Sequence, residues 1–471
     1  MPAHPRSMPR PARTLPRAVC AVAGALGLAA SPAGAQTPSQ QVVRGPVASY
    51  WLSADTVSGF AAMGAGGGIG IGGMLGMLAG RAPAPVRTLD LRLGSSQSAA
   101  GAPEAAHLIP QGMAMGAQLP LVTPEPVRGT SEPVERTLPR GIDQQPKGRM
   151  LIYWGCGEQV GPGQPVVVDF SKIGPGQPMP NLVSRSVRAP RGPAFGQNRS
   201  YGAWPNERDR QAVPEQASLR GEHQVKGNYS PDIRFAVDQH DFMPPVELAS
   251  SKTPSGTQRM TWRPVGGATG YFMTAVGAGG AGGAGAAGGA DGGGSVDIVM
   301  WTSSAVQETG GALSDYVQPS EVARLIRERV VLPPDRTECT LPAEVARAMP
   351  AGLLSFVAYG DELNVTHPPR PADAKVPWDI QWQVKLRLKS STSLMLGDGM
   401  AGMMGAGGGR APAGGTGAGA GAGTTQAPAD APATDGAPPA ASQPPAAGTP
   451  TEAVEQGLRE GARVLRGLFN R

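Results

Sequence analysis

The stretch Trp382-Gln-Val-Lys-Leu-Arg-Leu-Lys389 decides the fold class of this chain. Apolar and polar side chains alternate strictly along it, with Lys385, Arg387 and Lys389 at the polar positions. Successive side chains of a β-strand point to opposite faces, so this pattern predicts a strand with one face in a core and the other in water. The same alternation at 89–93 and 233–237 predicts two more such strands.

Two other segments are short, continuous apolar runs. Met150–Trp154 and Val166–Phe170 are separated by residues 155–165, which are rich in Gly and Pro. This arrangement predicts a hairpin whose strands are covered on both faces. Together the patterns indicate a mainly β fold made of two antiparallel, sandwich-like modules.

Helical periodicity is confined to two segments. Residues 320–331 place apolar side chains at the 3.6-residue period, with Ser320 as the expected N-cap. Residues 451–471 predict an amphipathic helix with acidic residues near its start and arginines near its end, the order that the helix dipole favours. Its apolar stripe consists of Val454, Leu458, Ala462, Leu465 and Phe469.

Composition limits how much of the chain can form a compact core. Of 471 residues, 69 are Gly and 49 are Pro, and only 16% are charged. Low-complexity sequence of this kind excludes an ordinary compact enzyme that fills the whole length. For residues 60–80, a Gly- and Met-rich tract, a flexible loop is favoured over a membrane span. Residues 277–294 form a Gly/Ala insertion, and residues 397–450 a disordered linker.

The N-terminus has the order of regions found in a secretory signal peptide. A basic segment over 1–17 precedes an uncharged apolar segment over 18–30, and Ala33-Gly34-Ala35 fits the cleavage pattern. Cleavage gives a mature start at Gln36 and a periplasmic or secreted protein. It removes four arginines and no acidic residue, so the formal net charge falls from +5 to +1. A nearly neutral chain lacks the electrostatic footprint of a nucleic-acid-binding protein.

Two cysteines remain after cleavage, Cys156 and Cys339. An exported protein meets an oxidising compartment, where two thiols can form one disulfide. The alternative is a pair of buried free thiols, and the sequence leaves both open.

The run Met260-Thr-Trp-Arg-Pro-Val-Gly-Gly-Ala-Thr-Gly-Tyr271 resembles the second and third strands of fibronectin type III domains. In that family a core Trp precedes a short turn and a core Tyr. The resemblance implies a β-sandwich in which Trp262 and Tyr271 are buried. Further strands are then expected at 296–301, 353–359 and 380–388.

The first half of the chain carries a second resemblance. Three short sequence motifs in it resemble those of an uncharacterised family of exported proteobacterial proteins, and this resemblance implies no particular activity. The motifs are His107-Leu-Ile-Pro110, Leu119-Pro-Leu-Val-Thr-Pro124 and Tyr153-Trp-Gly-Cys-Gly157.

The expected domain organisation collects these segments. It comprises a signal peptide at 1–35, an N-terminal β-rich module at 42–180, a Pro-rich polar linker at 181–231, a fibronectin III-like sandwich at 232–396, a linker at 397–450 and a helix at 451–471.

A search for catalytic motifs predicts no catalytic or cofactor-binding residue. The chain has no Gly-x-Ser-x-Gly elbow, P-loop, His-Glu-x-x-His motif or paired-Cys zinc spacing. None of His107, His223, His240 and His367 stands four residues from another. Cys156 lies between two glycines, but the sequence designates no base for it.

Clustered methionines offer the one metal-binding hypothesis, because thioethers suit Cu(I). The clusters contain Met74, Met77, Met113, Met115, Met400, Met403 and Met404. Core filling is the competing interpretation. The function that these features favour is a non-enzymatic structural or protein-binding component of the cell envelope, with Cu(I) binding and an envelope hydrolase as alternatives. The expected partner is an envelope protein or membrane surface, contacted through the helix at 451–471. The alternative is that this helix folds back on the β modules of its own chain.

Overall fold

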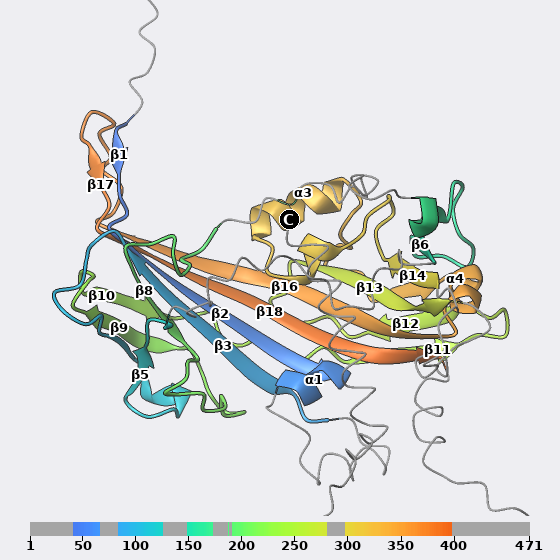
Figure 1. Cartoon of the computed structure of the whole chain (residues 1–471), viewed down its shortest axis with the longest axis horizontal. Coiled ribbons are helices and arrows are strands. Elements are labelled where there is room, and N and C mark those ends of the chain that lie inside the picture. The colour runs from blue at the N-terminus through green and yellow to red at the C-terminus, as the bar shows by residue number, and fades with distance from the viewer. Residues whose placement is uncertain are drawn as a thin grey trace, which may run out of the picture.

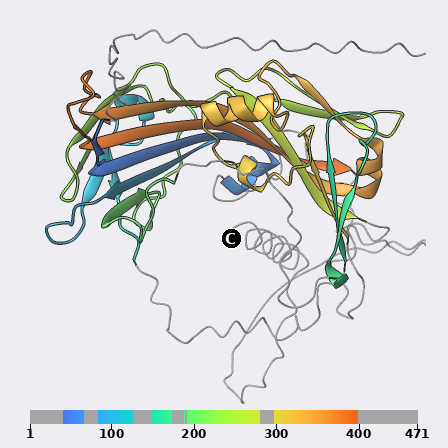
Figure 2. The same ribbon diagram turned by 90° about the horizontal axis from the view of Figure 1, so that it is seen from above.

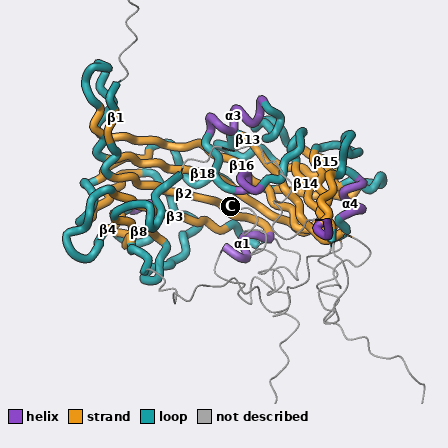
Figure 3. Tube along the Cα trace, turned by 45° about the horizontal axis from the view of Figure 1, so that its top comes forward, coloured by secondary structure: helices purple, strands orange, loops and turns teal. Residues whose placement is uncertain are grey.

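The computed structural model describes residues 41–65, 83–125, 148–172, 187, 191–279 and 297–397. In this part of the chain, a curved nine-stranded sheet runs the length of the molecule (Figures 1 and 3). Its strands, in spatial order, are β7 (Val166–Asp169), β6 (Arg149–Trp154), β14 (Asp297–Thr302), β13 (Gly270–Gly279), β16 (Ala351–His367), β18 (Trp382–Gly397), β2 (Ala48–Gly59), β3 (Val86–Ser95) and β8 (Ser200–Trp204).

Two smaller sheets complete the main core. One has the order β10 (Ile233–Val237), β9 (Gly221–Gly227), β4 (Ala105–Leu108) and β5 (Gln118–Leu121). The other has the order β11 (Leu248–Lys252), β12 (Gln258–Trp262) and β15 (Glu338–Leu341). Both contribute to one apolar cluster with β2, β3, β16 and β18, so sheets packed face to face form the core. A short parallel pair, β1 (Val43–Arg44) and β17 (Trp378–Asp379), projects from one end of the large sheet (Figure 1).

The helices are short and lie around the sheets. They are α1 (Phe60–Ala65), α3 (Pro319–Arg327), α4 (Ala343–Ala348) and the 3-10 turns η1 (Gln111–Met113), η2 (Phe170–Lys172) and η4 (Gly311–Ser314). Within the described residues, no helix has the length and apolar character needed to span a membrane.

The mainly β fold predicted from the sequence is confirmed, and the disposition of its modules differs from the expected one. β2 pairs in parallel with β18, and β6 pairs in parallel with β14. Strands from the 42–180 and 232–396 segments therefore alternate within one sheet. The expected linker at 181–231 supplies β8 and β9. Short-range patterning specifies strands, whereas these pairings depend on contacts between residues more than a hundred positions apart, which periodicity does not encode.

The alternating segments form the predicted strands, but one part of that prediction is wrong. Leu386 is fully buried as expected, whereas the opposite face of β18 is not in water. The side chains of Lys385 and Lys389 are only 16% and 13% exposed. The chain covers this face with the segment around η4, described below. The predicted hairpin of β6 and β7 is present, but β7 is an edge strand in which Val167 is 50% exposed, so it is not covered on both faces.

The predicted helix at 320–331 is shorter than expected. It begins with Pro319 at its first position and Gln318 at its N-cap, so Ser320 is not the cap. Pro is favoured at the first helical position because its missing N–H would have no partner there. The helix ends at Arg327, and Arg329 adopts a left-handed φ of 61°.

Trp262 and Tyr271 are both buried, as the fibronectin type III resemblance implies. Trp262 lies on β12 and Tyr271 on β13, in different sheets, and their rings meet edge to face at 5.6 Å. β14, β16 and β18 form at the three further segments where strands were expected. Membership of that family stays a prediction.

Several sequence predictions concern residues outside the described part. They are the signal peptide at 1–35, residues 66–80 of the Gly/Met-rich tract, residues 280–294 of the Gly/Ala insertion, residues 398–450 of the linker and the helix at 451–471. Residues 60–65 of the tract form α1, and residues 277–279 of the insertion end β13.

Candidate functional site

A group of half-buried charges lies on the polar face of β18. Lys385, Arg387 and Lys389 occupy alternate positions and therefore point to the same side of the sheet. Three like charges spaced in this way repel one another unless other groups separate them. The neighbouring strand β2 and the segment after η4 supply such groups.

Arg387 lies between two aromatic rings. Its guanidinium carbon is 4.8 Å from the centre of the Trp51 ring and 4.4 Å from that of Tyr316. Its Nε and Nη2 donate hydrogen bonds to Ser53 Oγ at 3.0 and 2.7 Å. Burial lowers the pKa of Arg387. The two rings compensate part of this desolvation through cation–π attraction.

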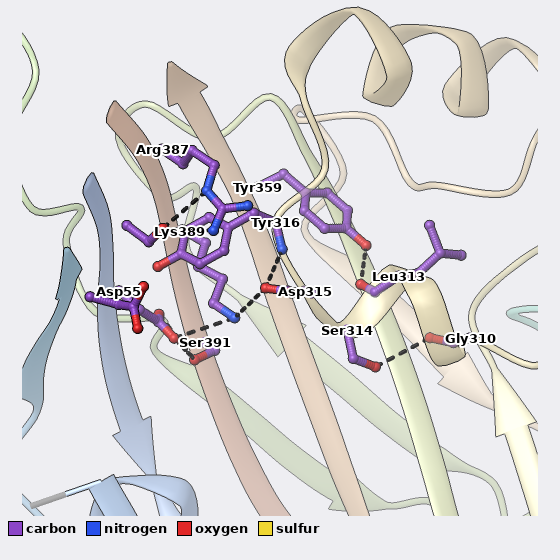
Figure 4. A network of polar contacts seen from close by, with 12 residues as sticks. Asp55, Gly310, Leu313, Ser314, Asp315, Tyr316, Tyr359, Arg387, Lys389 and Ser391 are labelled. Atoms are coloured by element: carbon purple, nitrogen blue, oxygen red, sulfur yellow. Dashed lines mark hydrogen bonds and ion pairs between the residues drawn. The ribbon is translucent and has the colours of Figure 1, made fainter. Parts of the chain in front are cut away.

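Lys389 joins two carboxylates to the same aromatic ring (Figure 4). Its Nζ lies 3.6 Å from Asp55 and 3.8 Å from Asp315, and 4.6 Å from the centre of the Tyr316 ring. Ser391 Oγ donates to both oxygens of Asp55 at 3.1 Å. Burial raises the pKa of Asp55, although Lys389 and Ser391 oppose that shift.

This network fastens one segment of chain onto the sheet. Tyr359 on β16 donates a hydrogen bond to the carbonyl of Leu313, and Ser314 donates to the carbonyl of Gly310 at 3.2 Å (Figure 4). On the two neighbouring strands β18 and β16, Lys385 donates a hydrogen bond to Glu362 at 2.8 Å. Because acids and rings from the chain itself surround the cations, we interpret the network as structural.

A second buried polar group lies on the other face of the large sheet. Tyr50 Oη is 2.8 Å from His107 Nδ1, and His107 Nε2 is 2.9 Å from His223 Nδ1. His223 Nε2 is 2.7 Å from the carbonyl of Leu219. This chain of hydrogen bonds links β2 of the large sheet to β4 and β9 of the four-stranded sheet.

One set of proton positions satisfies the whole chain. The carbonyl of Leu219 can only accept, so His223 carries its proton on Nε2 and accepts on Nδ1. His107 then donates from Nε2 and accepts on Nδ1 from the Tyr50 hydroxyl. Burial lowers the pKa of His107 well below 6.5 and also lowers that of His223. Both imidazoles are therefore neutral at pH 7.

The other two histidines of the described residues, His240 and His367, lie apart from this hydrogen-bonded chain. His240 Nε2 is 3.6 Å from an oxygen of Asp361, and the ring of His367 stacks on Trp382 at 5.0 Å. Among the described residues there is no cluster of three or more His, Cys, Asp or Glu side chains able to hold a metal ion.

Cys156 and Cys339 form a disulfide, which resolves the alternative that the sequence left open. The bond connects the loop after β6 with β15 across 183 positions of sequence. It ties the large sheet to the three-stranded sheet and leaves Cys156 without a free thiol for nucleophilic chemistry.

Two of the seven methionines proposed to bind Cu(I) lie in the described part. Met113 and Met115 are both buried in the main apolar cluster, where they pack as core side chains. The other five, Met74, Met77, Met400, Met403 and Met404, lie outside the described residues.

The projecting ribbon of β1 and β17 carries exposed apolar side chains. The described residues contain six exposed large apolar side chains. Three of them lie at the ribbon: Val43 in β1, Val42 directly before it and Val376 two residues before β17, at 52%, 53% and 47% exposure. Gly45, with a φ of 91°, lies where the ribbon leaves the sheet, and a Cβ there would lie 2.3 Å from the carbonyl oxygen of Ile380. The sequence patterns did not single out this ribbon, because its strands have two residues each.

Polar contacts hold the ribbon in shape. Gln41 Nε2 donates to the carbonyl of Val376 at 2.9 Å, and Arg370 Nε donates to Gln41 Oε1 at 2.8 Å. Trp378 Nε1 donates to the carbonyl of Pro368 at 2.9 Å, and the Arg370 guanidinium lies 5.7 Å from the centre of the Trp378 ring. The exposed valines are therefore presented on an ordered support.

Comparisons with protein families, with curated proteins and with solved structures find no match to this chain.

Proposed function

We propose that this protein is an exported, non-catalytic component of the cell envelope that binds another protein through the ribbon of β1 and β17. The single observation that carries this proposal is that three of the six exposed large apolar side chains among the described residues, Val42, Val43 and Val376, lie on or beside a projecting, hydrogen-bonded support. Exposed apolar groups gathered at one place are typical of interaction sites, whereas scattered ones need no explanation. A preorganised surface also loses little conformational entropy on binding.

Export is supported by two independent features. The signal-like N-terminus predicts passage across a membrane, and the disulfide of Cys156 and Cys339 is of the kind that persists in oxidising compartments. We expect the purified native protein to begin at Gln36. A retained Met1, measured by intact mass, would contradict export with cleavage.

The binding site is tested by substitution on the ribbon. The natural partner is captured from the envelope fraction with the wild-type protein and with Val43→Asp and Val376→Asp variants. Val167→Asp is the matched control, since Val167 is equally exposed at the opposite end of the sheet. We expect a charge on the ribbon to weaken the capture at least tenfold, and the control to bind like the wild type. If all variants retain the same partner, the ribbon is not the binding site.

A further inference from the structure

Arg387 differs from the other two cations on the polar face of β18, because it has no acidic partner. Lys385 pairs with Glu362 at 2.8 Å, and Lys389 lies 3.6 Å from Asp55. Among the residues that the structure describes, no carboxylate forms an ion pair with Arg387, and its Nη1 donates no hydrogen bond. A cation that is partly removed from water without a counter-charge is unfavourable, so the site favours an added anion.

The guanidinium of Arg387 is nevertheless held in one orientation. It lies between the rings of Trp51 and Tyr316, and Ser53 Oγ accepts hydrogen bonds from its Nε and Nη2. Ser53 thus takes two of the five N–H donors of a guanidinium. The remaining donors are presented by a side chain that has little conformational freedom left to lose on binding.

Arg387 lines a pocket between two strands and the start of a helix. A β-bulge in β16 places Gly360 and Asp361 opposite Leu388 of β18 and interrupts the ladder there. The pocket lies between this bulge and residues 316–319. Its empty volume is about 280 Å³ including its open mouth, which suits a small ligand or a single chemical group.

Two further features of the pocket favour a negative charge. Gln318 and Pro319, the N-cap and first residue of α3, line it, and no side chain caps this helix, so the positive end of the helix dipole lies at the pocket. Tyr316 also lines it, and its hydroxyl makes no hydrogen bond with a described residue. Burial raises the pKa of Tyr316, so the hydroxyl keeps its proton and can donate. Figure 2 shows α3, in yellow, at the middle of the curved sheet, away from the ribbon of β1 and β17.

Two acidic residues line the pocket as well, and they limit the charge of the ligand. Glu362 is neutralised by Lys385, at 2.8 Å. The Asp361 side chain is 61% exposed, with His240 Nε2 at 3.6 Å. Because Asp361 repels a doubly charged anion more strongly than a singly charged one, the pocket fits a single negative charge.

We propose that this pocket binds one carboxylate group, with the guanidinium of Arg387 as its main contact. A carboxylate is planar and carries one negative charge, and it matches the fixed N–H donors of an arginine. The group comes either from a free small organic acid or from the C-terminus of a peptide, since both present the same chemistry. The site is separate from the ribbon, so the proposal does not depend on what the ribbon binds.

Titration of the full-length protein with sodium acetate, followed by NMR, tests the site. Acetate replaces chloride at constant ionic strength, and the backbone amide signals of residues 360–362 report binding. We expect these signals to shift with half-saturation at roughly millimolar acetate. Arg387→Gln should abolish the saturable shift, and its other amide signals show whether the variant folds.

Two further variants make the test independent of the folding of Arg387→Gln. Asp361→Asn removes an opposing charge at an exposed position and should lower the half-saturating acetate concentration at least about threefold. Arg92→Gln is the matched control, because Arg92 pairs with Asp90 at 2.6 Å and is not among the residues that line the pocket. This control should leave the affinity for acetate unchanged.

The possible outcomes are distinct. The proposal is overturned if acetate gives no saturable shift, or if folded Arg387→Gln or Arg92→Gln shows that Arg387 is not specifically required. Tighter binding of inorganic phosphate than of acetate would also overturn it, since it would contradict the preference for a single charge. Trialanine with a free C-terminus and its C-terminal amide distinguish the two sources. Tighter binding of the free peptide than of acetate, with no binding of the amide, assigns a peptide C-terminus, whereas weaker binding of the peptide assigns a free small acid.

Discussion

Strand β2 buries polar groups on both of its faces, and the two faces do so by different means. On one face, Tyr50 begins a chain of neutral hydrogen bonds through His107 and His223. On the other face, Asp55 belongs to a network of opposite charges and aromatic rings around Arg387 and Lys389.

The difference lies in how each arrangement responds to a proton. Each hydrogen bond of the Tyr50–His107–His223 chain has one donor and one acceptor. An added proton therefore places a charge among apolar groups, or it converts an acceptor nitrogen into a donor that faces another donor. The charged network contains Asp55, whose pKa is already raised. Asp55 can take up a proton and lose its charge while Ser391 stays hydrogen-bonded to its carboxyl group. The neutral side is therefore the more sensitive of the two.

The largest effect is expected in the main apolar core, which lies on the same side of the large sheet as the histidine chain. Trp262 contacts the rings of Tyr271 and Phe356 at 5.6 and 5.1 Å. Trp262→Ala should lower the free energy of unfolding by about 3–5 kcal/mol, because it empties a large aromatic site. Urea denaturation measures this change. Phe195→Ala, at an exposed position, is the control and should stay within about 0.5 kcal/mol of the wild type.

The histidine chain itself gives the next effect. His107→Leu leaves the Tyr50 hydroxyl and His223 Nδ1 without their partner, and each orphaned group costs about 1–3 kcal/mol. We expect a loss of about 2–4 kcal/mol in urea denaturation. His240→Leu removes an imidazole from a partly exposed contact with Asp361 and should cost less than about 1 kcal/mol. Equal losses of unfolding free energy in the two variants would contradict the claim that the buried hydrogen bonds of His107 stabilise the fold.

Mild acid should distinguish the two faces without any substitution. Because the pKa values of His107 and His223 are lowered in the folded state, the unfolded chain binds more protons below pH 6.5. Their contribution to stability is complete above about pH 6.5 and decreases as the pH falls. From pH 6.5 to 5.5 we expect a loss of about 1–2 kcal/mol, measured by urea denaturation. In His107→Leu this dependence should be clearly weaker; an unchanged slope would exclude His107 as its source.

The charged face should show the smallest effect. Lys389→Met removes a cation whose carboxylate partners lie at 3.6 and 3.8 Å, beyond hydrogen-bond distance. Asp55 can respond by protonation, so we expect a loss of about 1 kcal/mol. The pKa of Asp55 should rise further, which carbon-detected NMR titration of its carboxyl group can follow. Lys226→Met, at an exposed position, should change neither quantity.

The strands could be predicted from the sequence because each depends on local alternation, as at Leu386 and its neighbours on β18. The burial of Lys385 and Lys389 could not, since it depends on a cover supplied by residues 311–316. His107 and His223 were recognised as individual histidines, but their contact follows from the pairing of β4 with β9 across 116 positions. The ribbon gave no periodic signal, because two residues do not establish a period.

The position of β18 also determines when the sheet can be completed during synthesis. β18 is the last described strand of the chain, and it lies between β16 and β2 near the middle of the nine-stranded sheet. The hairpin of β2 and β3 is made first, yet it has no neighbour on its β2 side until residue 397 has emerged. Pairing over such a separation is slow because a long loop must close first. The sheet therefore remains unfinished, with an open strand edge in its centre, until nearly all of the described sequence has been made.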